Sequence, residues 1–573
     1  MSAPEEQNAE PSAASADAAL WRRFAGVAGD DVKASPSYRL RLSGGGADGF
    51  GLHLGSVVPG DTLRGEALMA DVWRIGAERL ALEPGAAPWS VAAPSRHFAD
   101  RIHRFGWLPD LFTQGAAGAD RAVSLVDDWI EEFGKFHGFA WRAGPTADRV
   151  WHWMSCGAPL FEVGEETARR SRIDALSRQA RHLAFTFDDM VAPAARWRAA
   201  CALVAVEIAL NAGRKLPDAV ERLDHECSAQ ILADGGHVSR SPQRLLHALT
   251  DLLALKALFE RAGRETPDFF DKWPPRMGAM LSFFRSGDGA LTPFNDGGED
   301  RAEVVQAALD ALDAPPRGFS FAMKSGFQKL EKNGLRLLLD AGAAPEEPFA
   351  MNAHCGALAF DLSDGEQRLV TSCGFSPEIN LDWQAAVRRT GAHSTLAIAG
   401  RDAAPFVSHD QTRLLRPAGP DGISAKRLEE TDQIWLDAQH GGWKEKFSLL
   451  HRRRLFMAGD GSRVTGEDAL VRPVSQGAAD DAKFVSFEIR FHLHPTATAM
   501  TAGDVIKITG PDGRAWRFKT SHEGARLESS IYVGRGRLER TEQIVLSGKA
   551  DPNGDGSAPP NCVRWAILRE ERS

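Results

Sequence analysis

Apolar residues recur at every third or fourth position through the first half of the chain, from about Thr62 to Leu312. The segments 122–136, AVSLVDDWIEEFGKF, and 196–223, RWRAACALVAVEIALNAGRKLPDAVERL, show the pattern most clearly. This spacing predicts amphipathic helices, and Gly or Pro between the segments predicts their ends. We therefore expect a string of helical hairpins in which each helix covers its neighbours.

The period changes to two from about Pro316. Segments 318–342, GFSFAMKSGFQKLEKNGLRLLLDAG, and 483–495, KFVSFEIRFHLHP, alternate apolar and polar positions and are separated by Gly, Asp and Asn turns. This pattern predicts an antiparallel sandwich or barrel. Alternation also places Glu488, Arg490, His492 and His494 on one face of a strand, and divides the basic run 451–454, HRRR, between two faces.

The length of 573 residues exceeds what one ordinary core supports, so two or more domains are expected. We predict a flexible N-terminal tail and lead-in at residues 1–50, a helical domain at 51–315 and a β domain at 316–573. The boundary lies in the stretch LDAPPRGFS, near Pro315. Ligand sites commonly lie between domains, so we expect the site where these two meet.

Composition narrows the classes of partner. The content is 43% hydrophobic and 25% charged, which is typical of a soluble globular protein, and the net charge of -9 disfavours nucleic-acid binding by the whole surface. No run approaches the roughly 18 apolar residues of a membrane helix. The acidic start lacks a secretory pattern, and the six cysteines form no CxxC pair, so we expect a cytoplasmic protein with reduced thiols.

A glycine-rich turn precedes one of the predicted helices, in the stretch 234–243, DGGHVSRSPQ. Ser241 is a good N-cap and Pro242 a good first helical residue. A helix N-terminus beside His237 and Arg240 forms an anion site suited to a carboxylate or sulfate. The alternative is that these polar residues only cap the helix and fix the turn.

Aromatic residues accompany an arginine on an earlier predicted helix. Arg149 and Trp153 are four residues apart on one face, and Trp141 precedes them. Indole rings beside an arginine could line a sugar subsite, since a ring packs on a pyranose and the guanidinium pairs with a uronate. The alternative is ordinary core packing.

Imidazole and thiol groups follow one another in the β half. In 352–360, NAHCGALAF, alternation places Asn352 and His354 on one face of an extended chain, and Cys373 and His393 come later. These residue types can bind zinc. Alternatively, His393 satisfies backbone groups at the start of a strand.

Taken in order, these motifs resemble the heparinase II/III family of polysaccharide lyases. The resemblance covers about residues 60 to 500 and rests on W-x7-R-x3-W, DGGHVSRSPQ, NAHCGALAFDLS and AHSTLAIAG. It implies an (α/α) toroid followed by a β-sandwich, with β-elimination of uronic-acid-containing glycans as the activity. It also implies that His354 and His393 match two ligands of a structural zinc, with Cys373 or Ser372 near the third.

The family's usual catalytic tyrosine has no counterpart here. Family members commonly read SP-x-Tyr-His after the glycine-rich turn, whereas this chain has Gln243, Arg244 and Leu245 at those places, and its two tyrosines are Tyr38 and Tyr532. β-Elimination needs a neutralised carboxylate, a base and an acid. A lyase of this sequence would therefore use a histidine for proton transfer.

Three functions fit these observations: a divergent lyase, another carbohydrate-active enzyme such as a glycoside hydrolase, and an acidic-sugar-binding protein without activity. In the lyase, His237 or His354 transfers the proton and Arg240 or Asn352 neutralises the acid. The residues expected to contact the sugar are Trp141, Arg149, Trp153, Gln243, Arg244, Arg388 and Arg389.

Overall fold

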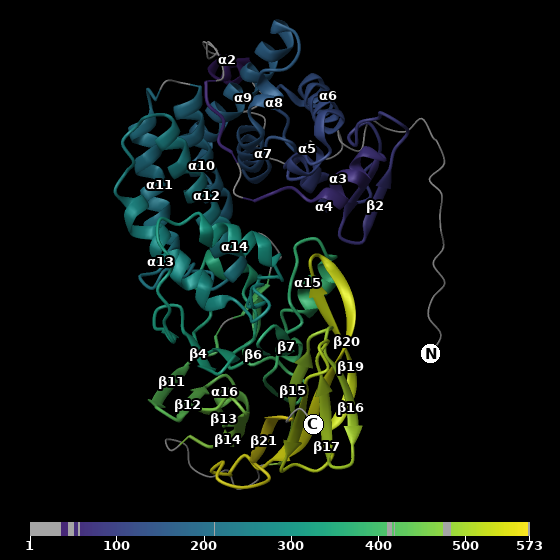
Figure 1. The fold of residues 1–573 in the computed structure, drawn as a ribbon, viewed down its shortest axis with the longest axis vertical. Coiled ribbons are helices and arrows are strands. Elements are labelled where there is room, and N and C mark those ends of the chain that lie inside the picture. Colours follow the sequence, from purple (N-terminus) through teal and green to yellow (C-terminus); the bar gives the residue numbers. More distant parts are fainter. Residues whose placement is uncertain are drawn as a thin grey trace. The chain divides into compact units, whose positions relative to one another are not determined.

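The computed structural model describes residues 36–43, 51–55, 58–210, 213–408, 415–417, 419–473 and 483–570 (Figure 1). Most of the predicted tail at 1–50 lies outside these residues, except the short helix α2 (Pro36–Leu42) and its surroundings. The chain forms two compact units, one from residues 1–51 and 60–188, the other from 52–59 and 189–573.

The first unit is helical, as its apolar period predicts. Its helices are α3 (Thr62–Met69), α4 (Arg96–His103), α5 (Leu108–Phe112), α6 (Gly115–Phe133), α7 (Ala143–Cys156), α8 (Ala158–Phe161) and α9 (Glu166–Thr186). A hairpin of β1 (Val72–Ile75) and β2 (Glu78–Ala81) interrupts them, which the sequence pattern did not predict.

The second unit begins with more helices: α10 (Pro193–Ala209), α11 (Leu216–Gln230), α12 (Pro242–Arg261), α13 (Phe269–Phe284) and α14 (Ala302–Asp310). Helix α12 begins as predicted, because the Ser241 side chain accepts a hydrogen bond from the Arg244 backbone amide and Pro242 occupies the first turn. Its stripe of leucines is buried. This packing fixes the direction of the glycine-rich turn in front of the helix.

Two antiparallel sheets follow α14. The eight-stranded sheet has the order β11 (Ser424–Glu430), β12 (Gln433–His440), β13 (Leu450–Ala458), β14 (Arg463–Val471), β21 (Cys562–Arg569), β18 (Ala515–Thr520), β17 (Val505–Thr509) and β16 (Thr498–Ala502). The nine-stranded sheet has the order β19 (Arg526–Gly534), β20 (Arg537–Ala550), β15 (Val485–Leu493), β7 (Gln367–Thr371), β6 (Phe360–Asp364), β5 (Leu335–Asp340), β4 (Phe327–Lys332) and β3 (Phe321–Ala322), with β8 (Leu396–Ile398) on β15.

Short elements connect the strands. They are the 3₁₀ turns η1 (Phe349–Asn352) and η2 (Thr390–Ala392), the helices α15 (Leu381–Ala386) and α16 (Lys444–Phe447), and a pair formed by β9 (Phe406–Ser408) and β10 (Leu415–Pro417). Strand β6 begins only at Phe360, so Asn352 and His354 lie in the connection before it rather than in a strand.

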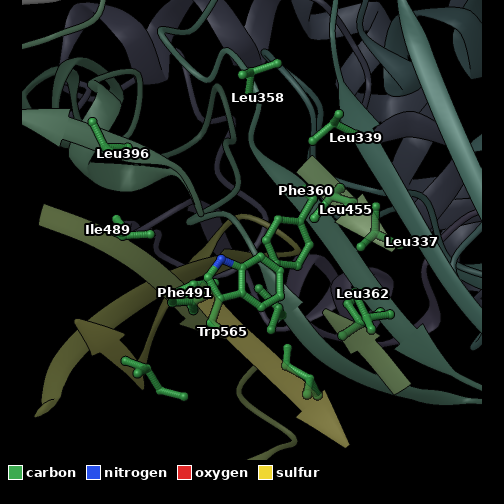
Figure 2. Packing of buried hydrophobic residues seen from close by; sticks show 14 of the residues in the cluster. Leu337, Leu339, Leu358, Phe360, Leu362, Leu396, Leu455, Ile489, Phe491 and Trp565 are labelled. Atoms are coloured by element: carbon green, nitrogen blue, oxygen red, sulfur yellow. The ribbon is translucent and has the colours of Figure 1, made fainter. Parts of the chain in front are cut away.

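One hydrophobic core joins the inner faces of the two sheets (Figure 2). Phe360 of β6 stacks on Trp565 of β21, with ring centroids 5.6 Å apart and planes 7° apart. Gly466 of β14 leaves room for the indole, since a Cβ there would lie 2.1 Å from Trp565 Cζ2. Face-to-face packing of this kind makes the C-terminal part a β-sandwich.

The basic run at 451–454 divides between the two faces of β13, as alternation predicts. His451 and Arg453 are buried and both bind Asp468, with His451 Nε2 and Arg453 Nε lying 2.8 and 2.7 Å from Oδ1. Arg452 and Arg454 lie on the other face and pair with Asp437. The buried carboxylate thus compensates the Arg453 charge inside the sandwich.

The change from helices to strands falls between α14 and β3, near the predicted boundary at residue 315. The two compact units divide instead at residues 188 and 189. The domain limits 51–315 and 316–573 therefore stay a prediction. In the part of the chain that the structure describes, no helix combines the length and the apolar character needed to cross a membrane.

Candidate functional site

The loop 293–300, PFNDGGED, is the centre of the candidate site, and it lies just before α14. Asn295 has a left-handed backbone, with φ of 52°, and its side chain connects two predicted elements. Its Nδ2 donates to the Arg240 carbonyl at 3.0 Å, and its Oδ1 accepts from the His354 amide at 3.2 Å. The loop therefore brings the glycine-rich turn before α12 next to the NAHCGALAF segment.

A glycine in this loop permits a close approach to the next segment. A Cβ at Gly298 would lie 2.7 Å from the Phe375 carbonyl oxygen, which is too close for any other residue without movement. The Phe375 ring in turn packs edge-on against His354, with centroids 5.6 Å apart. The glycine thus holds the acidic end of the loop close to this imidazole.

Asp296 is the carboxylate around which predicted site residues gather. Its Oδ2 accepts from Arg244 Nε at 2.6 Å and from Asn352 Nδ2 at 3.1 Å. Burial by itself would raise the pKa of Asp296, but the Arg244 charge and hydrogen bonds from Arg244, Ser241 and Asn352 hold it below its usual value. We call this group, Asp296 with Arg244 and Asn352, the Asp296 site.

Arg240 connects the glycine-rich turn to the sandwich. It has a left-handed backbone, with φ of 60°, its Nε donates to the Ser325 carbonyl at 2.8 Å, and its guanidinium pairs with Asp340 of β5. It also lies 4.6 Å from the centroid of the Phe327 ring. Because both partners of this ion pair are buried, the main contacts of Arg240 are internal.

His237 is a buried imidazole with internal partners. Its Nδ1 lies 2.7 Å from Ser239 Oγ, and its Nε2 lies 3.3 Å from Gln230 Oε1. Burial, assisted by the Arg244 charge, lowers the pKa of His237 to about 3. The ring is therefore neutral at physiological pH, and its hydrogen bonds fix the turn.

His354 and His393, which the resemblance matches to two zinc ligands, lie close together. Their ring centroids are 5.3 Å apart. Both ring nitrogens of His354 and Nε2 of His393 are buried with no hydrogen-bond partner among the described residues. Burial lowers the pKa of His354 well below its usual range and that of His393 to about 3. Two neutral imidazoles are therefore available as donors.

The remaining predicted zinc ligand is engaged elsewhere. Cys373 Sγ lies 3.6 Å from His492 Nδ1, and burial raises the pKa of the thiol to about 12. The described residues contain no group of three or more His, Cys, Asp or Glu side chains with metal-ligand geometry. Structural zinc sites usually have four donors. The two imidazoles alone do not fit such a site, because they supply two donors only. The zinc predicted from the sequence therefore stays a prediction.

Two arginines that follow α15 differ in exposure. Arg388 is buried, donates from Nε to the Ala353 carbonyl at 3.1 Å and lies over the Phe406 ring at 5.3 Å. Arg389 is exposed and forms an ion pair with Asp402 at 3.1 Å. Arg388 supports the His354 segment, whereas Arg389 is accessible to a ligand.

Gln243 binds a carboxyl group that the sequence analysis did not single out. Its Nε2 donates to Asp300 Oδ1 at 3.1 Å, and Asp300 Oδ2 has no hydrogen-bond partner in the described part of the chain. Burial, assisted by the charge of Glu299, raises the pKa of Asp300 to about 6. This carboxyl group can therefore gain and lose a proton near neutral pH.

A tyrosine from the C-terminal strands reaches the neighbouring Glu299. Tyr532 of β19 packs edge-on against His494, with ring centroids 5.0 Å apart, and His494 Nε2 lies 3.7 Å from Glu299 Oε2. Arg535 lies 3.8 Å from the other oxygen of Glu299. Burial raises the pKa of the Tyr532 phenol, which therefore holds its proton. Tyr532 lies far along the chain from the motifs singled out in the sequence.

Trp141, Arg149 and Trp153 belong to the first compact unit, and all three are buried. Arg149 Nε donates to Gln179 Oε1 at 2.5 Å and Nη1 to the His103 carbonyl at 2.8 Å, and the guanidinium lies 4.2 Å from the Trp129 ring centroid. This is the packing of a helical core. Core packing alone explains the spacing of these residues. The contact of these residues with a sugar stays a prediction, and their burial does not support it.

The structure thus gathers most predicted residues of the second unit around one loop. The signal for the loop itself was present in the sequence as NDGGED, where acidic residues flank two glycines before a helix. Asp296, Glu299 and Asp300 were missed because carboxylates in a loop between helices usually face solvent.

Comparison with known proteins gives three kinds of similarity. A family model described as "Heparinase II/III-like, C-terminal" matches residues 314–566. The chain is 31% identical over 569 residues to FtsZ-localized protein C of Caulobacter vibrioides (strain NA1000 / CB15N), covering 96% of each chain. The match extends through both the helical part and the sandwich.

Solved structures share the fold. Heparinase III matches with a TM-score of 0.67 and 14% identity, over 93% of this chain and 88% of the other. A mutant of the heparan sulfate lyase HepC from Pedobacter heparinus matches with a TM-score of 0.57 and 14% identity, over 96% and 88%. The chondroitin AC lyase of Streptomyces coelicolor A3, in complex with chondroitin sulphate, matches with a TM-score of 0.50 and 11% identity, over 96% and 82%.

These likenesses confirm the predicted fold class, a helical part followed by antiparallel sheets as in heparinase III. Identities this low show the fold and no activity. The full-length relative and the matching C-terminal model together settle the family. The chain belongs to the heparinase II/III-like family.

Proposed function

We propose that this protein is a non-catalytic member of its family that binds an acidic sugar at the Asp296 site. The observation that carries the proposal is the internal pairing of the polar and charged groups at this site and in the adjoining glycine-rich turn. Arg244 and Asn352 both bind Asp296, and Arg240 binds Asp340. A lyase needs such groups directed at the substrate carboxylate and at the transferred proton.

The predicted bases support the same conclusion. His237 has a pKa of about 3 and two internal partners, and the pKa of His354 is well below its usual range. Imidazoles held neutral this strongly are weak bases for a carbon-bound proton. Partly exposed cations remain at the rim, where the Arg244 and Arg535 side chains are 31% and 62% accessible. They suit the carboxylate or sulfate groups of an acidic sugar.

The full-length relative adds a cellular setting to the proposal. Its name states localisation with FtsZ, and it is more than twice as similar to this chain as the lyases above, at 31% against 14% identity. We propose that this protein likewise localises with FtsZ, which would place it in the cytoplasm. A fluorescent fusion that stays evenly distributed in dividing cells while FtsZ forms its ring would refute this part.

A divergent lyase is the second candidate, and Asp300 is the observation that favours it. A carboxyl group with a pKa of about 6 can exchange a proton at neutral pH, which none of the predicted histidines does as readily. In this alternative Asp300 takes the role of the missing tyrosine, and the protein cleaves uronic-acid-containing glycans by β-elimination.

One pair of assays separates the two candidates. Heparan sulfate and chondroitin sulfate oligosaccharides are tested for binding by calorimetry and for unsaturated products by ultraviolet absorbance. We expect binding without product, weakened by Asn352→Ala and Arg244→Gln. Arg317→Ala removes an exposed arginine between α14 and β3 and is the charge-matched control. Product formation that Asp300→Asn abolishes would establish the lyase, and absence of binding to every acidic sugar would refute both candidates.

A further inference from the structure

The face of the eight-stranded sheet that is turned away from the core carries a continuous row of side chains. The strand registers pair Trp435 with Phe456, Phe456 with Thr465, Thr465 with Ala566 and Ala566 with Lys519. The row therefore crosses β12, β13, β14, β21 and β18, which are successive neighbours in the sheet. The labels of β12, β13, β14 and β21 mark this part of the sheet in Figure 1. The alternate residues of these strands face the core.

The row lies in a cavity of about 460 Å³, which we call the outer-face groove. Trp435 is 46% exposed, and its ring centroid lies 4.6 Å from that of Phe456. A partly exposed pair of aromatic rings in a concave surface is a feature of ligand sites. The residues that line the groove are Trp435, Arg454, Leu455, Phe456, Thr465, Gly466, Glu467, Lys519, Thr520, Ser521, Arg564, Trp565 and Ala566.

The groove has an excess of positive charge, although the whole chain has a net charge of -9. Arg454 Nη1 and Arg564 Nε each lie 3.0 Å from a different oxygen of Glu467, and Arg454 Nε lies 3.4 Å from Asp437, which is outside the groove lining. Lys519 is exposed and forms no ion pair with the described residues. These charges favour an acidic occupant.

A ligand in the groove would contact side chains, because the backbone N–H and C=O groups of the strands beneath it are paired within the sheet. Strand β13 pairs with β12 and β14, β14 pairs with β13 and β21, and β21 pairs with β14 and β18. A peptide therefore cannot add itself to the sheet as a further strand, which is the usual way in which an extended peptide gains affinity on a sheet. Aromatic rings beside the Thr465 hydroxyl group suit a sugar ring, which has an apolar face and a polar edge. The Thr520 and Ser521 hydroxyl groups donate to the Arg564 carbonyl.

We propose that the outer-face groove binds an acidic oligosaccharide. Sugar rings stack on Trp435 and Phe456, and Lys519 and Arg564 pair with carboxylate or sulfate groups. The ligand class rests on the proposed function, but no residue is shared with the Asp296 site. The protein thus contacts an acidic glycan at two separate places.

Calorimetric titration of the full-length protein with heparan sulfate oligosaccharides tests this inference. We expect two sites per chain in the wild type. Trp435→Ala and Lys519→Glu should each weaken one of them about tenfold, since each removes a principal contact. Phe321→Ala removes a similarly exposed ring, 51% accessible on β3, and should leave both sites unchanged. Circular dichroism confirms that each variant is folded.

The outcomes distinguish this inference from the proposed function. One site that depends on Trp435 and not on Asn352 supports the groove and refutes the Asp296 site. Binding that is unchanged in both Trp435→Ala and Lys519→Glu overturns the groove, as does complete absence of binding. If polyglutamate binds as tightly and depends equally on Trp435 and Lys519, the ligand class is wrong.

Discussion

Replacing Asp300 by asparagine should remove a loss of stability that the wild type suffers as the pH rises from about 4 to about 6. The Asp300 carboxyl accepts one hydrogen bond from Gln243 at 3.1 Å, and its other oxygen has no partner among the described residues. Burial and the nearby Glu299 charge raise its pKa to about 6. The ionised form is therefore disfavoured in the folded protein relative to the unfolded chain.

The magnitude follows from the two pKa values. An unfolded aspartate titrates near about 3.9, so the shift of about 2 units corresponds to about 3 kcal/mol. A raised folded-state pKa stabilises the protein fully below the unfolded value, and this stabilisation is lost as the pH rises through the folded value. The loss should extend from about pH 4 to about pH 6. Asparagine cannot ionise and keeps the stability over this range.

Urea unfolding of wild type and Asp300→Asn at a series of pH values measures this effect. The difference in unfolding free energy, variant minus wild type, should increase by about 2 to 3 kcal/mol between pH 4 and pH 8. Replacing the carboxylate oxygen by an amide nitrogen can add a pH-independent difference in unfolding free energy. This difference does not affect the test, because only the change of unfolding free energy with pH is compared. Asp382→Asn, the same change at an exposed carboxyl group on α15, is the matched control. Parallel pH profiles for Asp300→Asn and wild type would refute the reasoning.

The other predictions concern stability and metal. Arg240→Ala should cost about 3 to 5 kcal/mol of unfolding free energy, because it leaves Asp340 buried without its partner. The double variant Arg240→Ala/Asp340→Ala should lose less, and an equal or larger loss in the double variant would contradict this explanation. Gly466→Ala should cost about 1 to 3 kcal/mol or more in the same assay, because its Cβ would lie 2.1 Å from an indole carbon. Zinc analysis of protein purified without chelator should give less than one ion per chain, because His354 and His393 supply only two donors; one full equivalent that is lost in both alanine variants would show that the site is complete.

The sequence alone determined that the first half of the chain is mainly helical and the second mainly sheet, although the hairpin of β1 and β2 was not predicted. The periods of about 3.6 and 2 follow from local backbone geometry, so they remain readable without tertiary contacts. The cap at Ser241 and Pro242 is local in the same way, and it correctly marked the start of α12. The order of motifs also gave the family, because it spans both parts of the chain.

Only the tertiary structure decided which polar residues meet and in which ionisation state. The contacts of Asp296 with Arg244 and Asn352 span more than fifty positions along the chain. Burial, which sets the low pKa of His237 and the high pKa of Asp300, depends on packing by distant segments. For the same reason Arg149 had the sequence features of a ligand contact but lies inside a helical core, and Tyr532 appeared remote but packs against His494 beside Glu299. Periodicity indicates which side of an element is apolar, whereas the identity of the neighbours on the other side is fixed only when the chain folds.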